Sequence, residues 1–241
     1  MRFAIQILAL AVDLPLQVLI VAALIRGSWR RFPLVLALSV VELISALVQA
    51  PGALESALGR HSPGITYQAA YWTGETINRL LVYAVVISLL YQACARLRSA
   101  RPVRAALILG ACLVAGGTFL AHYDPSQARG LWMTPWFRDL NFTCAAIDIM
   151  LWTLLLVARD RDRQLLLLSG GLGVEFAGAS IGESLRQMSI PSRSVPLAWT
   201  GSAVIVAATA FRLYAWWRAL RRQPVKNTPP RLAALGEPGS L

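Results

Sequence analysis

The sequence is poor in lysine and histidine. Its only lysine is Lys226, in the polar C-terminal segment, and its only histidines are His61 and His122. A retinal protein needs a lysine inside an apolar span, so the chain cannot be a retinal-binding pump or receptor. Two histidines are too few for a multi-histidine zinc hydrolase or a bis-haem carrier. No apolar segment holds a histidine base for an intramembrane serine protease.

Cysteine is equally scarce. The three cysteines fall inside apolar segments without a close-spaced pair, and they are Cys94, Cys112 and Cys144. We interpret them as small apolar residues and not as a disulfide or metal framework. His122 can form a weak outer metal site with Asp139 or Glu183, but we favour an interfacial hydrogen-bonding role for it. We therefore expect no cofactor, no bound metal and no complete set of catalytic residues.

Charge is the third shortage. Charged residues make up 15% of the chain and hydrophobic residues 56%, whereas about 25% of a typical soluble domain is charged. In a soluble protein the formal net charge of +11 would suggest a nucleic-acid partner. Here the arginines cluster between apolar runs, so the expected partner is the lipid bilayer and not nucleic acid.

Apolar runs of about 20 residues, each long enough to cross a bilayer, recur along the sequence. We predict an all-α, polytopic membrane protein with a seven-transmembrane-helix bundle in residues 1–220. The expected spans lie near residues 4–25, 33–50, 67–95, 103–121, 135–157, 164–188 and 195–219.

Several residues suggest where these spans end. Pro51–Gly52 is expected to terminate the second span, as these residues do at many helix ends. His122–Thr134 is predicted to be a longer connection, and Trp132 and Trp136 near its exit suit the membrane–water boundary. The polar, proline-rich tail, residues 221–241, is predicted to be disordered.

The arginines predict the orientation, because positive charge marks the cytoplasmic side of a membrane protein. Alternate connections and the tail carry nearly all of them: Arg26, Arg30, Arg31, Arg96, Arg98, Arg101, Arg104, Arg159, Arg161, Arg163, Arg218, Arg221 and Arg222. The other connections hold only Arg60, Arg129 and Arg193. We therefore expect an outside N-terminus and a cytoplasmic C-terminus.

The third span combines an apolar run with polar residues on one helical turn. Glu75 and Arg79 are four residues apart and can pair on one face, with Asn78 beside them. Charged groups at bilayer depth face a bundle interior or a water-filled cavity. The pair can be an ion pair that fixes helix orientation or part of a ligand or proton site.

Acids outnumber bases inside the predicted spans. The acids are Asp13, Glu42, Glu75, Asp148, Glu175 and Glu183, and the clear cations at comparable depth are Arg79 and, nearer the outside, Arg186. A carboxyl group without a partner in a low dielectric is more stable when neutral. We expect at least one of Asp13, Glu42, Asp148 and Glu175 to be protonated at neutral pH.

The sixth span places an acid, two glycines and an arginine at helical spacing: Glu175, Gly178, Gly182 and Arg186. The glycines predict close helix packing. We expect Glu175 and the adjoining Glu183 to point inward, toward Arg79. This arrangement can be a polar lock between helices or a site for a ligand, proton or cation.

Other glycines have the same packing interpretation. Gly110, Gly116 and Gly117 in the fourth span are expected to allow close helix contact. Residues 170–173, Gly-Gly-Leu-Gly, lack the Lys-Ser/Thr that completes a phosphate-binding loop. Helix packing explains them better.

The span pattern, with Tyr71-Trp72-Thr73-Gly74-Glu75 opening the third span, resembles uncharacterised bacterial seven-helix integral membrane proteins. This resemblance implies a bacterial cytoplasmic (inner) membrane location and transfers no activity or residue role. The plan also resembles the seven-helix sensor modules of bacterial receptors, which usually carry a kinase, cyclase or phosphodiesterase domain. The short tail has no such domain.

These features predict a sensor or binding module with a polar, outward-facing pocket, which acts through a separate partner protein. The candidate ligand or proton site consists of Glu75, Asn78, Arg79, Asp148, Glu175 and Glu183, with Asp13 and Glu42 as secondary buried acids. Two alternatives stay open: a proton- or cation-coupled transporter, and a non-catalytic subunit of a membrane complex. The sequence carries no signal for a particular oligomeric state.

Overall fold

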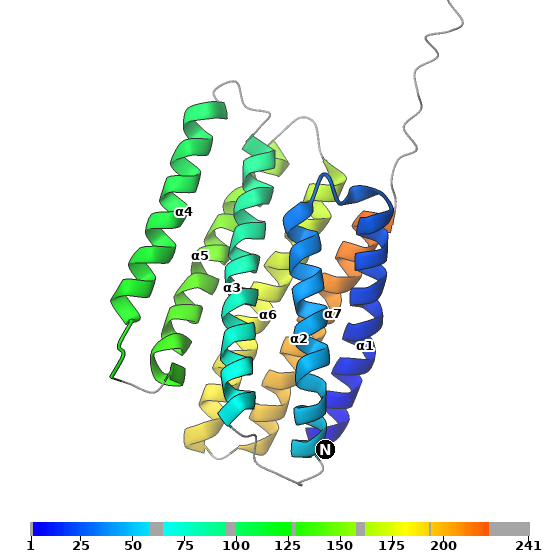
Figure 1. The fold of residues 1–241 in the computed structure, drawn as a ribbon, viewed down its shortest axis with the longest axis vertical. Helices are drawn as coiled ribbons and strands as arrows, with labels where there is room; N and C mark the ends of the chain where they lie inside the picture. Colours follow the sequence, from blue (N-terminus) through cyan, green and yellow to red (C-terminus); the bar gives the residue numbers. More distant parts are fainter. Residues whose placement is uncertain are drawn as a thin grey trace, which may run out of the picture.

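The computed structural model describes residues 2–57, 65–94, 100–126, 129–157, 162–192 and 194–221. These residues form seven long helices and no strand (Figure 1). The helices are α1 Arg2–Ala23, α2 Pro33–Ala57, α3 Ile65–Cys94, α4 Ala100–His122, α5 Arg129–Val157, α6 Arg163–Ser192 and α7 Val195–Arg221. A short π-helical turn, η1 (Leu24–Ser28), follows α1. The predicted tail lies outside the described residues, apart from Arg221.

The helices have the length and composition of membrane spans. Among the described residues, five helices contain an apolar stretch long enough to cross a bilayer: Tyr71–Cys94, Ala105–His122, Trp132–Leu156, Arg163–Ser189 and Val195–Arg221. α2 contributes a shorter apolar stretch, Pro33–Val48. The chain is therefore an all-α, multi-pass membrane protein, as the sequence predicts.

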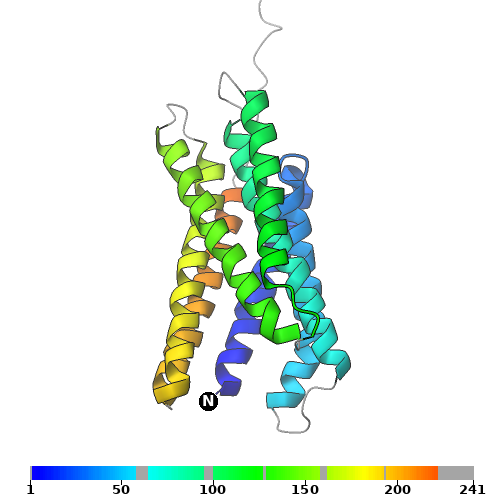
Figure 2. The ribbon, with the colours of Figure 1, turned by 90° about the vertical axis from the view of Figure 1, so that its left-hand side faces the viewer.

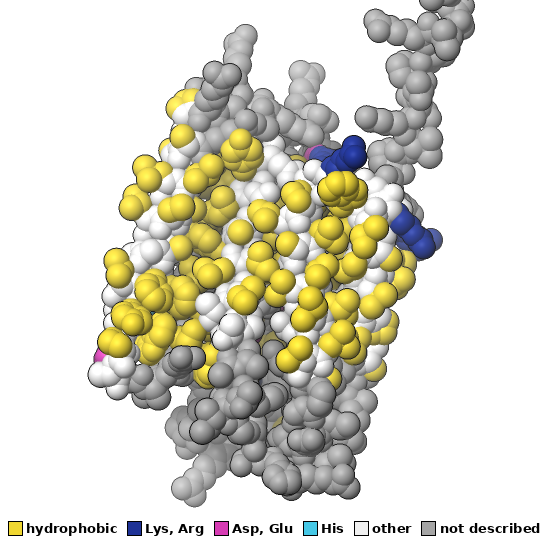
Figure 3. All heavy atoms as spheres, in the orientation of Figure 1, with side chains coloured by type: hydrophobic (Ala, Val, Ile, Leu, Met, Phe, Trp, Pro, Cys, Tyr) yellow, Lys and Arg dark blue, Asp and Glu magenta, His cyan; other side chains and the backbone are white. Residues whose placement is uncertain are grey.

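Successive helices run in opposite directions, so α1, α3, α5 and α7 end at the same end of the bundle, the top in Figure 1. The N-terminus lies at the opposite end. The face shown in Figure 3 is mostly hydrophobic, and its basic side chains lie near the upper end. Described arginines around that upper end include Arg26, Arg30 and Arg31 after α1, and Arg218 and Arg221 at the end of α7.

Two expected helix boundaries are wrong. α2 does not end at Pro51–Gly52 but continues to Ala57. α5 begins at Arg129 with Pro135 inside it, so the connection after α4 is shorter than predicted. Proline and glycine are tolerated within transmembrane helices because neighbouring groups can satisfy the freed backbone atoms. Proline and glycine therefore mark a helix boundary less reliably in this chain than in a helix of a water-soluble protein.

The start of α6 is fixed by a side-chain cap. The Oδ1 atom of Asp162 accepts hydrogen bonds from the backbone N–H groups of Gln164 at 3.0 Å and Leu165 at 3.3 Å. Such a cap satisfies donors that have no partner inside the helix. Arg31, just before α2, binds both Asp162 and the Oε1 atom of Gln164, the latter at 2.7 Å. The cap therefore also joins the N-terminal ends of α2 and α6.

α6 and α7 are packed closely through glycine. A Cβ atom added at Gly182 would lie 2.6 Å from the carbonyl oxygen of Gly201 and would overlap the side chain of Ile205. One added at Gly178 would overlap the side chain of Ala208. The predicted small-residue contact is thus confirmed, and its partner is α7. Figure 2 shows these two helices side by side, with α5 inclined across them.

α4 is a peripheral helix. Nothing lies within 4 Å of a Cβ atom placed at Gly110, Gly116 or Gly117, so the expectation that these glycines permit close helix contact is wrong for the described chain. Large apolar side chains such as Leu109 and Leu113 are exposed. Because the chain is a membrane protein, these apolar side chains suit a lipid-facing helix.

Candidate functional site

Arg212 of α7 is the centre of a buried ion cluster. Its side chain is 2% exposed. Its Nη2 atom lies 2.8 Å and 2.9 Å from the two carboxyl oxygens of Glu42 on α2. Its Nε atom lies 3.0 Å from Oε2 of Glu175 on α6. One guanidinium group thus joins three helices and binds two carboxyl groups.

The packing of α6 against α7 positions this guanidinium group. Gly171 leaves space for Trp216, because an added Cβ atom would lie 3.1 Å from Cδ1 of the indole and 3.4 Å from Cα of Arg212. The Nε1 atom of Trp216 donates a hydrogen bond to the carbonyl of Leu168 at 2.9 Å. The guanidinium carbon of Arg212 lies 4.9 Å from the centre of the Trp216 ring, a cation–π distance.

A second ion pair lies on α3. Arg79 donates from Nε to Oε1 of Glu75 at 2.7 Å and from Nη1 to Oδ1 of Asn141 on α5 at 3.0 Å. The predicted pairing of Glu75 with Arg79 is therefore confirmed. Arg79 also interacts electrostatically with Glu175, which links this pair to the Arg212 cluster.

Asp13 extends the arrangement to α1, since it interacts electrostatically with both Arg212 and Glu42. We call the connected set the polar network. Its members are Asp13, Glu42, Glu75, Arg79, Asn141, Glu175 and Arg212. Four of these side chains are acids and two are bases, so the predicted excess of buried acids persists after the partners are identified.

The two acids of α6 are placed differently from what the sequence predicts. Glu183 is not directed into the bundle: its side chain is 57% exposed and lies 3.6 Å from Arg186, three residues later on the same helix. Glu175 is directed inward. The sequence predicts that it points toward Arg79, but its ion-pair partner is Arg212. Eight residues separate the two acids, which turns Glu183 partly away from Glu175 on the helix.

Asn78 and Asp148 are also placed differently. The Oδ1 atom of Asn78 is buried without a hydrogen-bond partner in the described residues, so Asn78 does not join the Glu75–Arg79 pair. Asp148 lies in the interface of α5 and α6, where a Cβ atom added at Gly173 would be 2.7 Å from its Oδ2 atom. Its Oδ1 atom likewise has no hydrogen-bond partner in the described part of the chain.

Arg212 and Asn141 were not among the predicted site residues. The sequence predicts only Arg79 and Arg186 as cations at bilayer depth and not Arg212, because arginines near the end of a span commonly extend to the membrane surface. The available signal was its position inside the run Val-Ile-Val-Ala-Ala-Thr-Ala-Phe-Arg-Leu-Tyr-Ala-Trp-Trp, nine residues before Arg221. At 1.5 Å per residue this places it about 14 Å from the end of α7.

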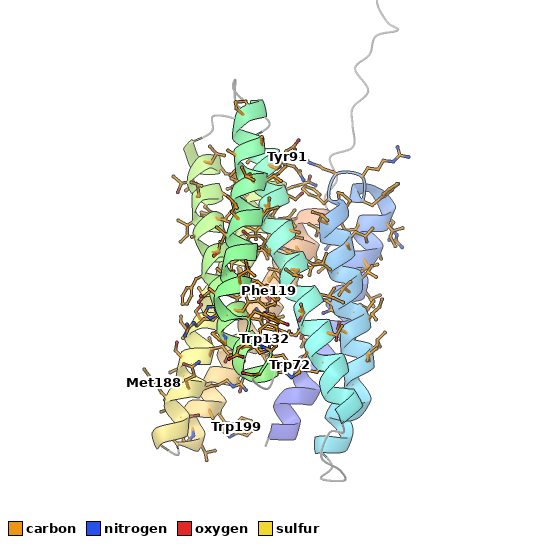
Figure 4. The ribbon with its side chains drawn as sticks, turned by 60° about the vertical axis from the view of Figure 1, so that its left-hand side comes forward. Trp72, Tyr91, Phe119, Trp132, Met188 and Trp199 are labelled. Carbon is orange, nitrogen blue, oxygen red and sulfur yellow. The ribbon has the colours of Figure 1, made fainter. Side chains whose placement is uncertain are left out.

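An aromatic cluster lies near the lower end of α3, α4 and α5. Its members are Tyr71, Trp72, Phe119, Tyr123, Trp132, Trp136 and Phe137. Figure 4 shows Trp72, Phe119 and Trp132 close together. Trp136, which we expect near the membrane–water boundary, is 5% exposed and packs on Phe119 with ring centres 5.1 Å apart.

His122 lies beside this cluster. Its Nε2 atom is 2.8 Å from Oδ2 of Asp139, which confirms the hydrogen-bonding interpretation. The described residues contain no group of three or more His, Cys, Asp or Glu side chains that could hold a metal ion. The candidate site is therefore the polar network.

A scan against protein-family models and searches of curated proteins and solved structures found no match to this chain.

Proposed function

We propose that the protein is a seven-helix sensor or binding module of a bacterial cytoplasmic membrane, with its N-terminus outside. In this proposal a small polar ligand binds at the polar network, and a separate partner protein receives the signal. The observation that carries the proposal is that one set of buried and partly buried charged and polar side chains, linked by ion pairs, a hydrogen bond and electrostatic interactions, comes from α1, α2, α3, α5, α6 and α7.

Such a network suits a sensor because its charges set the relative positions of the helices. A ligand changes a conformational equilibrium only if it interacts differently with the two conformations. A polar ligand that competes for Glu75, Arg79 or Glu175 would replace contacts between helices with contacts to itself. The buried location amplifies this effect, since electrostatic interactions are stronger in a low dielectric.

Thermal stability of the purified protein in mild detergent tests the proposal. The ligands would be a panel of amino acids, primary amines, small carboxylates and sugars. We expect at least one compound class to raise the melting temperature of the wild type, because a ligand that binds only the folded state stabilises it. The shift should disappear in Glu75→Gln and in Arg79→Ala.

The matched controls are Glu183→Gln and Arg186→Ala, which remove the exposed ion pair of α6 and should keep the shift. Equal shifts in all four variants and the wild type would place binding outside the network. A panel without any stabilising compound would also contradict the proposal.

The excess of buried acids favours one alternative, a proton- or cation-coupled transporter. Acids inside transmembrane bundles are common in proton relays, and the network holds four acids for two arginines. Reconstitution into proteoliposomes with an imposed pH gradient distinguishes the two functions. Net proton or cation flux that is lost in Glu175→Gln supports transport, whereas ligand-dependent stabilisation without flux supports a sensor.

A further inference from the structure

Two buried acceptor oxygens on α1 have no donor. The Oδ1 atom of Asp13 and the Oε1 atom of Gln17 both lack a hydrogen-bond partner among the described residues. Gln17 is 6% exposed. The two residues are four apart, so their side chains lie on one face of the helix, one turn from each other. A buried polar atom without a partner is costly, and two together call for an explanation.

The neighbouring arginine does not supply the missing donors. Arg212 interacts electrostatically with Asp13, but its Nη2 atom contacts Glu42 and its Nε atom is paired with Glu175. Neither its Nε atom nor its Nη1 atom makes a hydrogen bond to the described chain, and the guanidinium group lies over the ring of Trp216. No donor of Arg212 therefore forms a hydrogen bond with either of the two oxygens.

The acids near Asp13 outnumber the bases. Asp13 interacts with Glu42 as well as with Arg212, and Glu175 is paired with the same arginine. Three acids therefore share one guanidinium group. A ligand that brings positive charge and hydrogen-bond donors would compensate the acids and satisfy both orphan acceptors.

We propose that Asp13 and Gln17 form a binding site for a protonated amine, an alkylammonium group with free N–H donors. An ammonium group can donate to both oxygens at once, as the side chain of lysine does in proteins. A metal ion fits less well, because the described residues contain no group of three or more acidic, histidine or cysteine side chains suited to one. Asp13 is partly accessible whereas Gln17 is buried.

The proposal rests on the proposed function and deepens it, because it names the class of ligand that the polar network takes. Asp13 provides the charge, Gln17 adds the second acceptor, and Glu42 and Glu175 maintain the negative field. Binding would bring new charge to α1 beside Arg212, which already joins α2, α6 and α7. Occupation of the site would thereby affect several helices.

The probes are methylammonium chloride, tetramethylammonium chloride and sodium chloride at equal ionic strength, with the purified full chain in mild detergent. The readout is the melting temperature as a function of salt concentration. We expect methylammonium to raise it more than either of the other salts. Tetramethylammonium has the same charge without N–H donors, and sodium is a small cation without them, so equal shifts for all three salts would overturn the proposal.

Variants locate the site. Asp13→Asn and Gln17→Leu should each raise the half-maximal concentration of methylammonium by about tenfold or more, the effect expected for the loss of a hydrogen bond to a charged group. Asp124→Asn and Gln187→Leu remove similar groups elsewhere and should leave it unchanged. If Asp13→Asn fails to fold, Gln17→Leu and the comparison of salts on the wild type still decide the question.

The outcome is separable from that of the ligand panel. Stabilisation by methylammonium that depends on Asp13 and Gln17 but not on Glu75 or Arg79 supports the amine site and contradicts the wider network as the ligand site. Stabilisation by another compound class that depends on Glu75 and Arg79, without any effect of methylammonium, supports the network and overturns the amine site.

Discussion

α4 and the α6–α7 pair both contain glycines at positions that predict close helix packing, yet only the glycines of the α6–α7 pair contact a neighbouring helix closely. The glycines of α6 contact α7 so closely that an added Cβ atom at Gly178 or Gly182 would overlap it. A Cβ atom at Gly116 or Gly117 of α4 would meet nothing within 4 Å. A small residue permits close approach, but only a docked partner helix makes use of it.

The two regions also differ in charge. α7 carries Arg212, which is 2% exposed and joined to two acids from other helices. The membrane stretch of α4, residues 105–121, has no charged residue. Close packing and buried charge therefore coincide in the α6–α7 pair. Substitutions in the two regions should therefore differ in their effect on stability.

Loss of the buried arginine should have the largest effect. Arg212→Met leaves Glu42 and Glu175 without their shared cation, and removal of one partner from a buried pair costs about 3–5 kcal/mol. Arg186→Met removes an exposed arginine and should cost no more than about 1 kcal/mol. Unfolding in detergent measures both. Arg212→Lys, which keeps the charge, should recover part of the loss, and equal losses in the two Met variants would contradict the buried cluster.

A single methyl group should separate the two sets of glycines. Gly182→Ala forces α6 away from α7, and overpacking of this kind costs about 1–3 kcal/mol. Gly116→Ala adds a methyl group in open space and should be neutral, or stabilising by up to about 1 kcal/mol, because alanine favours helix more than glycine does. Thermal unfolding of both variants checks the contrast. A destabilised Gly116→Ala would show that α4 has a close partner.

The smallest effect is expected where α4 is attached to the bundle. The hydroxyl of Tyr83 on α3 donates a hydrogen bond to the carbonyl of Ala111 on α4 at 3.0 Å. Tyr83→Phe removes only this bond and should cost about 0.6 kcal/mol, the average for hydrogen bonds between transmembrane helices. Tyr214→Phe, at an exposed position, is the control and should cost less. A loss of several kcal/mol in Tyr83→Phe would mean that α4 is as firmly integrated as α6.

Local features of the site were predictable. The pairing of Glu75 with Arg79 follows from a separation of four residues on one helix, which brings side chains together whatever the rest of the chain does. Contact of the α6 glycines followed from their spacing, although the identity of the partner helix did not. The inward direction of Glu183 was predicted wrongly. Glu183 lies eight residues after the inward-facing Glu175, and this separation turns its side chain partly away around the helix axis.

The amino-acid sequence by itself determined that this chain is a bundle of membrane helices, because apolar length and the need to satisfy the backbone inside lipid leave little choice. Only the tertiary structure decided which charges meet. Glu42 and Arg212 are 170 residues apart, and nothing in their local sequence indicates the contact. Their pairing depends on which faces of α2, α6 and α7 dock, and that choice is made by packing over the whole bundle.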